Sequence, residues 1–188
     1  MIRIGILGDI GSGKTYVAKS FGYPVFNADL EVNKIYRNNR KCFEKLNRSF
    51  PKYVKKFPIK KNEIKQILNK KNIKLISKIV HPYVRLGLKK FLRKNKNNKF
   101  VVLDIPLLLE NRLDKKNDIL VCIKTYKKKI VKRLKKRGGY KKKIIEILKS
   151  QQLNINKKLK VCDFIIENNS HRNNILRQIK IIKKKLND

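Results

Sequence analysis

The chain has 188 residues, a length that suits one domain with a small insert, and its hydrophobic content of 41% is enough for a core. The 8 glycines and 5 prolines argue against a low-complexity or collagen-like chain, no apolar run approaches the length that spans a membrane, and the 3 separate cysteines argue against a disulfide framework or a zinc site. The 51 Lys and Arg against 13 Asp and Glu give a formal net charge of +38, which fits either a polyanionic partner or a general compositional bias.

The first expected element is a short apolar strand over residues 2–7, which leads directly into a glycine-rich motif. Residues 8–15 read G-D-I-G-S-G-K-T, a match to G-x-x-x-x-G-K-T, and residues 15–21 continue as a helix. A phosphate-binding P-loop requires this order, because glycines let several backbone N–H groups point at one anion and the helix adds its positive end. We expect Lys14 to reach the β- and γ-phosphates of a nucleoside triphosphate and the Thr15 hydroxyl to hold Mg²⁺.

A second short strand is expected at residues 25–26, and it ends at Asn27-Ala28-Asp29. The turn after a parallel strand is where open α/β sheets meet their ligands. A carboxylate there can accept the proton of an attacking hydroxyl, so Asp29 is a candidate general base. Capping of the following helix is the plainer role open to Asp29.

Residues 30–100 show helical periodicity with links rich in lysine and asparagine, and we interpret them as a helical insert that covers an acceptor substrate. Helices are expected at residues 30–36, 42–50, 63–68, 73–80 and 84–92. His81-Pro82 is expected to end one helix and open the next, with the proline in its first turn.

The second half of the chain alternates strands and helices. Strands are expected at residues 100–104, 119–123 and 164–166, and helices at residues 127–136, at 143–153 and near the C-terminus. This pattern predicts an α/β fold with a parallel five-stranded sheet of the P-loop NTPase type, flanked by helices, in a single domain of residues 1–188. Asp104 closes the third strand, a position from which a carboxylate can orient Mg²⁺ or simply accept backbone hydrogen bonds.

This arrangement favours a small-molecule kinase over a GTPase or a motor ATPase. No N-K-x-D motif stands where it could read a guanine base, and motor ATPases are normally larger. The insert would hold the acceptor, and a basic segment at about residues 127–145 would close as a lid. Arg133 and Arg137 lie on one helical face of that segment, where they would either neutralise the transferring phosphate or be two more solvated charges of a basic helix, and Gly138-Gly139 is a candidate hinge.

Further motifs resemble those of the dephospho-CoA kinase family over nearly the whole chain. They are the P-loop, Asp29 after the second strand, His81-Pro82, the D-I-P-L-L-L-E-N run at residues 104–111, the arginines of the basic segment, Gln151, and the C-D-F-I-I-E-N run at residues 162–168. The resemblance implies phosphorylation of the ribose 3′-hydroxyl of dephospho-CoA, the last step of coenzyme A biosynthesis, with ATP and Mg²⁺.

The resemblance also implies roles for single residues. ATP would be bound by Gly11, Ser12, Gly13, Lys14, Thr15, Tyr16 and Asn168, the last of them near the adenine. The acceptor would be bound by Asp29, His81, Pro106, Leu107 and Glu110. Catalysis would fall to Asp29, Lys14 and Arg137, and Mg²⁺ to Thr15 and Asp104. The chain departs from the family pattern at Tyr16, where threonine is usual, and at Asn27, where aspartate is usual.

Two other functions stay open: another nucleoside or nucleotide kinase, and a basic nucleic-acid-binding P-loop protein. Lysines occur on nearly every polar face and the aromatic residues are scattered, so we favour compositional bias as the source of the charge. We therefore expect no specific nucleic-acid partner, only non-specific polyanion binding at low salt. With no visible targeting or membrane segment, the cytoplasm is the expected location and no membrane partner is expected.

Overall fold

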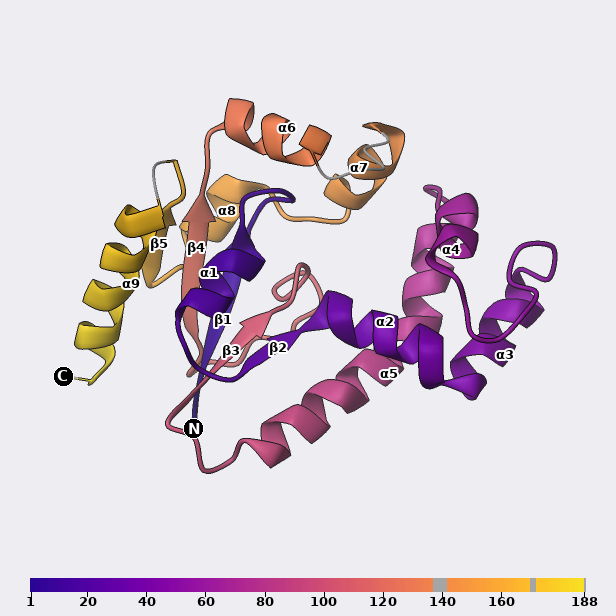
Figure 1. The fold of residues 1–188 in the computed structure, drawn as a ribbon, viewed down its shortest axis with the longest axis horizontal. Helices are drawn as coiled ribbons and strands as arrows, with labels where there is room; N and C mark the ends of the chain where they lie inside the picture. Colours follow the sequence, from indigo (N-terminus) through magenta and orange to yellow (C-terminus); the bar gives the residue numbers. More distant parts are fainter. Residues whose placement is uncertain (137–141, 170–171, 188) are drawn as a thin grey trace. The chain divides into compact units, whose positions relative to one another are not determined.

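The structure is a computed structural model that describes residues 1–136, 142–169 and 172–187 (Figure 1). The chain forms two compact units. The first combines Met1–Asn27 with Asn95–Asp188, and the second is Ala28–Lys94. Residues 95–100, which the sequence analysis grouped with the insert, thus belong to the first unit.

The first unit is built on a parallel five-stranded sheet, which confirms the predicted fold class. Its strands are β1 Ile2–Gly8, β2 Val25–Asn27, β3 Phe100–Asp104, β4 Ile119–Lys124 and β5 Phe164–Glu167, in the order β2-β3-β1-β4-β5. The central strand β1 is buried from its second residue onward, and Ile4 pairs with Val102 on one side and Ile119 on the other. All five strands therefore present their carboxyl ends at one edge, where Gly8, Asn27 and Asp104 lie.

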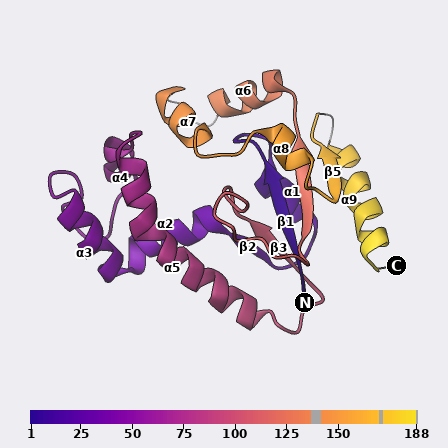
Figure 2. The ribbon, with the colours of Figure 1, turned by 180° about the vertical axis from the view of Figure 1, so that it is seen from behind.

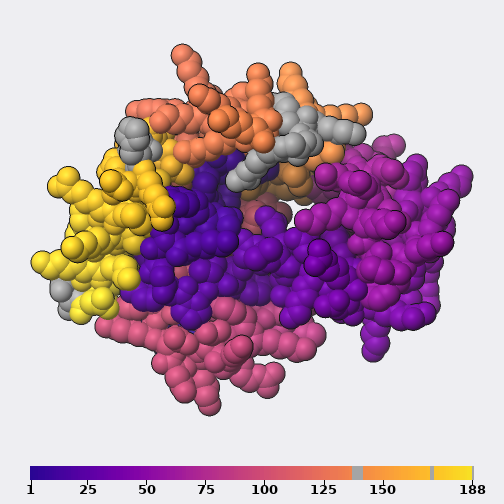
Figure 3. All heavy atoms as spheres, in the orientation of Figure 1, coloured from indigo at the N-terminus to yellow at the C-terminus, as the bar shows by residue number. Residues whose placement is uncertain are grey.

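Two helices cover one face of this sheet. The helices α1 Lys14–Ser20 and α9 Arg172–Asn187 contribute Val17, Phe21 at the end of α1, and Ile179 to the same buried cluster as Ile4 of β1. The space-filling view shows α9 lying beside the N-terminal residues at the surface of this unit (Figure 3).

The opposite face of the sheet is covered by a loop and a short helix. A Cβ atom on Gly5 would lie 2.6 Å from Leu108 Cδ2, so β1 and the loop after β3 approach closely there. The helix α8 Ile155–Leu159 packs on β1, as Figure 2 shows from behind.

Two more helices, α6 Lys127–Lys136 and α7 Lys142–Lys149, follow β4. The prediction of one helix over residues 143–153 is wrong at its end, because the chain turns after Lys149 and α8 begins as a separate helix. The side chain of Asn154 caps α8 by accepting a hydrogen bond from Asn156 N at 2.9 Å. An asparagine at this position was the signal for a new helix.

The second unit consists of the helices α2 Ala28–Asn38, α3 Arg40–Ser49, α4 Lys61–Ile67 and α5 Asn72–Lys94. Helix α5 packs against both α2 and α3. Asn39 caps α3, since its side chain accepts a hydrogen bond from Cys42 N at 2.8 Å. In the described ranges, no helix combines the length and the apolar character that crossing a membrane requires.

The expected break at His81-Pro82 is wrong, because α5 continues through both residues for 23 residues in all. Proline removes one helical hydrogen bond and crowds the preceding turn. The buried stripe continues on both sides of it, from Val80 to Val84 and Leu88, so packing of that face offsets the local cost.

Candidate active site

The glycine-rich loop joins β1 to α1 as the sequence predicts. Gly11 and Gly13 have φ values of 83° and 97°, in the left-handed region that glycine adopts without strain. A Cβ atom on Gly13 would lie 2.3 Å from Asn168 Nδ2, so the loop is packed too closely there for any side chain. The backbone thus forms a tight curl at the N-terminal end of α1, the shape that cradles a phosphate chain.

Lys14 folds back onto this loop. Its side chain is buried, and Nζ donates hydrogen bonds to the backbone oxygens of Gly8 at 3.0 Å and Asp9 at 2.8 Å. The ammonium group is therefore held at the loop, close to the N–H groups that an anion would contact. A phosphate chain placed there would meet a positive charge on one side and the helix N-terminus on another.

Thr15 and Asp104, the predicted magnesium pair, do lie together. Thr15 Oγ1 donates a 2.6 Å hydrogen bond to Asp104 Oδ2, and Asp104 is only 2% exposed. The same oxygen accepts a hydrogen bond from Asn27 Nδ2, because β2 and β3 pair with Asn27 beside Asp104. Asp104 Oδ2 is thus held by two side-chain donors, one from the glycine-rich loop and one from the end of β2.

These oxygens fit Mg²⁺. The ion prefers oxygen ligands and, in kinase sites, takes one or two from the protein and the rest from phosphates and water. Nowhere in the described part of the chain do three or more His, Cys, Asp or Glu side chains gather as a ready-made metal site. Thr15 and Asp104 are therefore the residues that would hold the ion beside a bound nucleotide.

The outer side of the loop is held by three side chains. The backbone oxygen of Ser12 accepts hydrogen bonds from Thr125 Oγ1 at 3.0 Å, Arg133 Nη1 at 3.0 Å and Asn168 Nδ2 at 2.7 Å. Asn168, predicted to lie near the adenine, is 4% exposed and contacts the loop backbone. Arg133 is likewise not a solvated charge of a basic helix.

Two further candidates on the nucleotide side are Tyr16 and Arg137. Tyr16 follows Thr15 in α1 and is 37% exposed, so its phenol is accessible from solvent. Arg137, the favoured lid arginine, lies outside the described residues, as do Gly138 and Gly139.

The loop after β3 holds three acceptor-side candidates, Pro106, Leu107 and Glu110. Glu110 Oε1 accepts a hydrogen bond from Leu153 N at 2.8 Å and forms an ion pair with Lys158 Nζ at 3.0 Å. The side chains of the pair are 10% and 1% exposed. The carboxylate thus ties this loop to the segment after α7.

A second hydrogen bond supports this tie, since Gln152 Nε2 donates to the backbone oxygen of Pro106 at 3.1 Å. The contact is made by the residue after Gln151, the glutamine that the family resemblance singled out. Leu107 is half-buried, a placement compatible with the core or with a substrate wall.

Asp29 and His81 both belong to the helical unit. The turn expected before Asp29 is absent, because α2 begins directly after β2 and Asp29 is exposed in its first turn, where a carboxylate complements the helix dipole. His81 is half-buried in the middle of α5. Burial, and then the nearby charge of Arg85, lower the pKa of His81 below its ordinary value.

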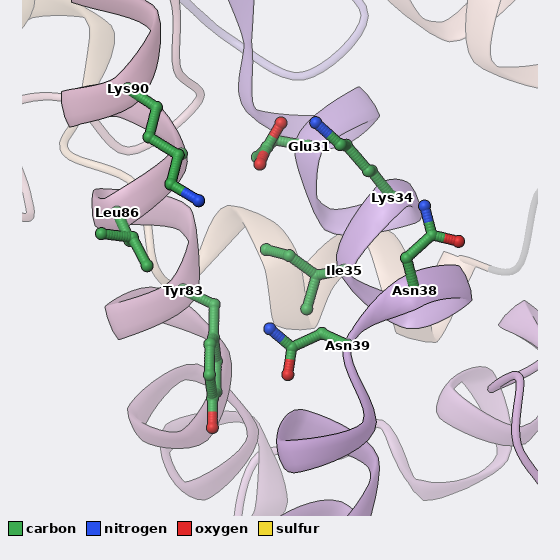
Figure 4. Close-up of a pocket in the computed structure, with 9 residues that line it drawn as sticks. Glu31, Lys34, Ile35, Asn38, Asn39, Tyr83, Leu86 and Lys90 are labelled. Carbon is green, nitrogen blue, oxygen red and sulfur yellow. The ribbon is translucent and has the colours of Figure 1, made fainter.

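The helical unit also contains a pocket that sequence reasoning missed. It lies between α2 and α5, and Figure 4 shows Glu31 and Lys34 on one side and Tyr83, Leu86 and Lys90 on the other. Glu31 packs against Gly87, whose Cβ would lie 2.3 Å from Glu31 Oε1. The pocket is therefore lined by both charges and by apolar carbons.

Two residues of the sheet unit that contact the site were also missed, Thr125 and Lys158, and Asn27 was noted only as a departure from the family pattern. Asn27 and Thr125 stand at strand ends, a position that could have marked them. The sequence gives no way to recognise Lys158 as the partner of Glu110, because several other lysines lie beside it.

The glycine loop after β1, the lysine folded onto it and the paired Thr15 and Asp104 define a nucleotide-binding protein of the P-loop kinase class. A family model described as dephospho-CoA kinase matches residues 2–174. The chain therefore belongs to the dephospho-CoA kinase family.

Individual relatives agree over nearly full length. The dephospho-CoA kinase of Wolbachia sp. subsp. Brugia malayi is 33% identical over 186 residues, covering 95% of each chain, and that of Bartonella henselae is 32% identical, covering 97% of each. A solved structure from Thermus thermophilus is 27% identical with a TM-score of 0.78, covering 98% of this chain and 97% of that one. A deoxyadenosine kinase from M. mycoides, 18% identical with a TM-score of 0.53 and full coverage of both chains, shares the fold.

Proposed function

We propose that the protein transfers the γ-phosphoryl group of ATP to the ribose 3′-hydroxyl of dephospho-CoA, the last step of coenzyme A biosynthesis. The observation that carries the proposal is the family match over residues 2–174, on a chain whose loop places Lys14 and the Thr15–Asp104 pair together. The class of reaction is the one that a phosphate cradle with a lysine and a magnesium pair can support.

The nucleotide is bound by the glycine-rich loop and the two residues next to it in space, Thr15 and Asp104. The backbone of residues 11–15 binds the phosphate chain, and Lys14 leaves the oxygens of Gly8 and Asp9 to contact the β- and γ-phosphates. Thr15 and Asp104 would hold Mg²⁺, and the bound ion would supply positive charge to stabilise the phosphate oxygens. Such a site works by positioning and charge neutralisation, since phosphoryl transfer needs little covalent help from the protein.

Asp29 is proposed to accept the proton of the attacking 3′-hydroxyl. The hydroxyl oxygen forms the new bond to phosphorus, the bond between the γ-phosphorus and the bridging oxygen breaks, and ADP leaves with that oxygen. An exposed carboxylate at the start of α2 is accessible to a substrate hydroxyl. His81 and Glu110 are proposed on the acceptor side, Arg137 on the transferring phosphate, and Asn168 and Tyr16 on the nucleotide side.

The proposal is tested by coupling ADP formation to an optical readout with a panel of acceptors. We expect turnover with dephospho-CoA and Mg²⁺, and little with deoxyadenosine or shikimate. The Lys14→Ala variant should lose activity while keeping its circular dichroism spectrum, because alanine is a strong helix former at the start of α1. Turnover with deoxyadenosine alone would favour another nucleoside kinase instead.

We also propose that the enzyme works in the cytoplasm, where ATP is available.

A further inference from the structure

The backbone oxygen of Ser12 is unusually well supplied with donors. A carbonyl oxygen has two lone pairs, yet this one accepts from Thr125, Arg133 and Asn168 at 3.0, 3.0 and 2.7 Å. Thr125 follows β4 directly, Arg133 comes from α6 and Asn168 follows β5. Three separate segments therefore converge on one peptide of the glycine loop.

The guanidinium of Arg133 joins the group together. Its Nη1 donates to Ser12 O, while Nη2 donates to both the backbone oxygen and Oδ1 of Asn168, at 3.1 and 2.9 Å. With Oδ1 held by Arg133, the amide nitrogen of Asn168 faces Ser12 O. A lysine would have to reach Ser12 O and both Asn168 oxygens from a single nitrogen, so it would not reproduce the geometry of this planar fork.

The planar peptide bond between Ser12 and Gly13 fixes the direction in which the Gly13 N–H points. Ser12 C=O and Gly13 N–H belong to one planar trans unit, in which the oxygen and the hydrogen point in opposite directions. Holding the Ser12 oxygen outward, toward α6 and Asn168, therefore holds the Gly13 N–H inward. Donors on the oxygen also polarise the unit and make that N–H a stronger donor.

We propose that Thr125, Arg133 and Asn168 form a clamp on the Ser12 carbonyl that aims the Gly13 N–H at the phosphates of the bound nucleotide. They are positioning residues for nucleotide binding, and the inference rests on the nucleotide-binding function proposed above. Asn168 then promotes nucleotide binding by fixing the loop backbone instead of by contacting the adenine. Arg133 has the same role, which does not depend on movement of the basic segment.

Three variants test the clamp with minimal change of shape. Thr125→Val removes one donor and keeps the volume, Arg133→Lys keeps the charge and loses the fork, and Asn168→Asp keeps the partner of Arg133 while removing the donor to Ser12 O. Lys132→Ala is the matched control, because it removes a positive charge from the exposed face of the same helix. Thr125→Ser restores the hydroxyl and should recover affinity relative to Thr125→Val.

The measurement is calorimetric binding of ADP and of tripolyphosphate at moderate salt, with folding checked by thermal melting. Arg133→Lys and Asn168→Asp should weaken both ligands by the same factor, about 10-fold, and Thr125→Val by about 3-fold, whereas Lys132→Ala should change neither. In steady-state assays the KM for ATP should rise in the same order, with the KM for dephospho-CoA unchanged.

Two results would overturn the clamp while leaving the proposed function intact. Folded Arg133→Lys and Asn168→Asp proteins that bind both ligands like the wild type would show that the Ser12 contacts are dispensable. Weakened ADP binding with unchanged tripolyphosphate binding would place Asn168 and Arg133 at the adenine. A wild-type protein that binds neither ligand would instead contradict the proposed function itself, and the clamp with it, so the two failures are distinguishable.

Discussion

At the carboxyl edge of the sheet, one oxygen of Asp104 accepts hydrogen bonds from Thr15 and from Asn27. The family usually has aspartate in place of Asn27, and two carboxylates so close would repel each other. The amide of Asn27 instead donates, and it holds Asp104 against the P-loop threonine. The departure at position 27 thus preserves the orientation of the residue that would carry Mg²⁺.

The lowered pKa of His81 predicts how the free energy of unfolding changes with pH. Its pKa is lowered in the folded protein, first by burial and then by Arg85, so the unfolded chain takes up a proton near the ordinary value of 6.5 while the native histidine is still neutral. The free energy of unfolding should therefore fall as the pH drops below about 6.5, and His81→Gln should flatten this dependence.

The pH dependence is measured by urea unfolding at several values between about pH 7.5 and about pH 5. The contribution of His81 is fully present above its unfolded pKa and is lost as the pH falls through its lower folded value. Parallel curves for the wild type and His81→Gln would mean that burial of His81 does not affect stability.

Residue contacts mark the limit of what the sequence could predict. The pairing of Thr15 with Asp104 was accessible, because a strand-end carboxylate and a P-loop hydroxyl meet at one edge of a parallel sheet. The role of Thr125, Arg133 and Asn168 was not, because a hydrogen bond to a backbone oxygen leaves no residue pattern at Ser12. Lys158 was hidden for a different reason, since its partner Glu110 lies 48 positions away and lysines surround it.

At the scale of elements, two asparagine caps were signals that the sequence analysis did not use, and one proline was misleading. Asn39 and Asn154 stand directly before α3 and α8, and the side chain of each accepts a hydrogen bond from the first turn of its helix. Pro82 suggested a break that the buried stripe of α5 overrides. Tertiary packing decided the outcome, because the buried side chains of Val80, Val84 and Leu88 together stabilise the helix by more than the roughly 3 kcal/mol that an interior proline costs.

The cap of α3 provides the prediction at this scale. Asn39→Ala removes the acceptor for Cys42 N and should lower the free energy of unfolding by about 1 kcal/mol. Asn39→Asp, which retains the acceptor oxygen, serves as the control and should stay near the wild type. Chemical denaturation with a common m-value measures both, and equal losses in the two variants would contradict the capping account.

For the whole molecule, the net charge of +38 is the dominant property. Because lysines are spread over the polar faces, RNA binding should depend on phosphates alone and be indifferent to sequence. We expect the logarithm of the RNA association constant to fall linearly with the logarithm of salt, by about 0.7 for each phosphate contacted on a single strand. Filter binding with two unrelated RNAs measures this, and salt-resistant preference for one RNA would revive the nucleic-acid-binding alternative.

The proposed function depends on which atom of the acceptor receives the γ-phosphoryl group of ATP. The direct measurement is to react the protein with ATP, Mg²⁺ and dephospho-CoA and to identify the product by mass spectrometry and phosphorus NMR. We predict one ADP for each acceptor consumed and a single new phosphate on the ribose 3′-oxygen. A folded, nucleotide-binding protein that leaves dephospho-CoA unchanged, or phosphorylates it elsewhere, would contradict the account.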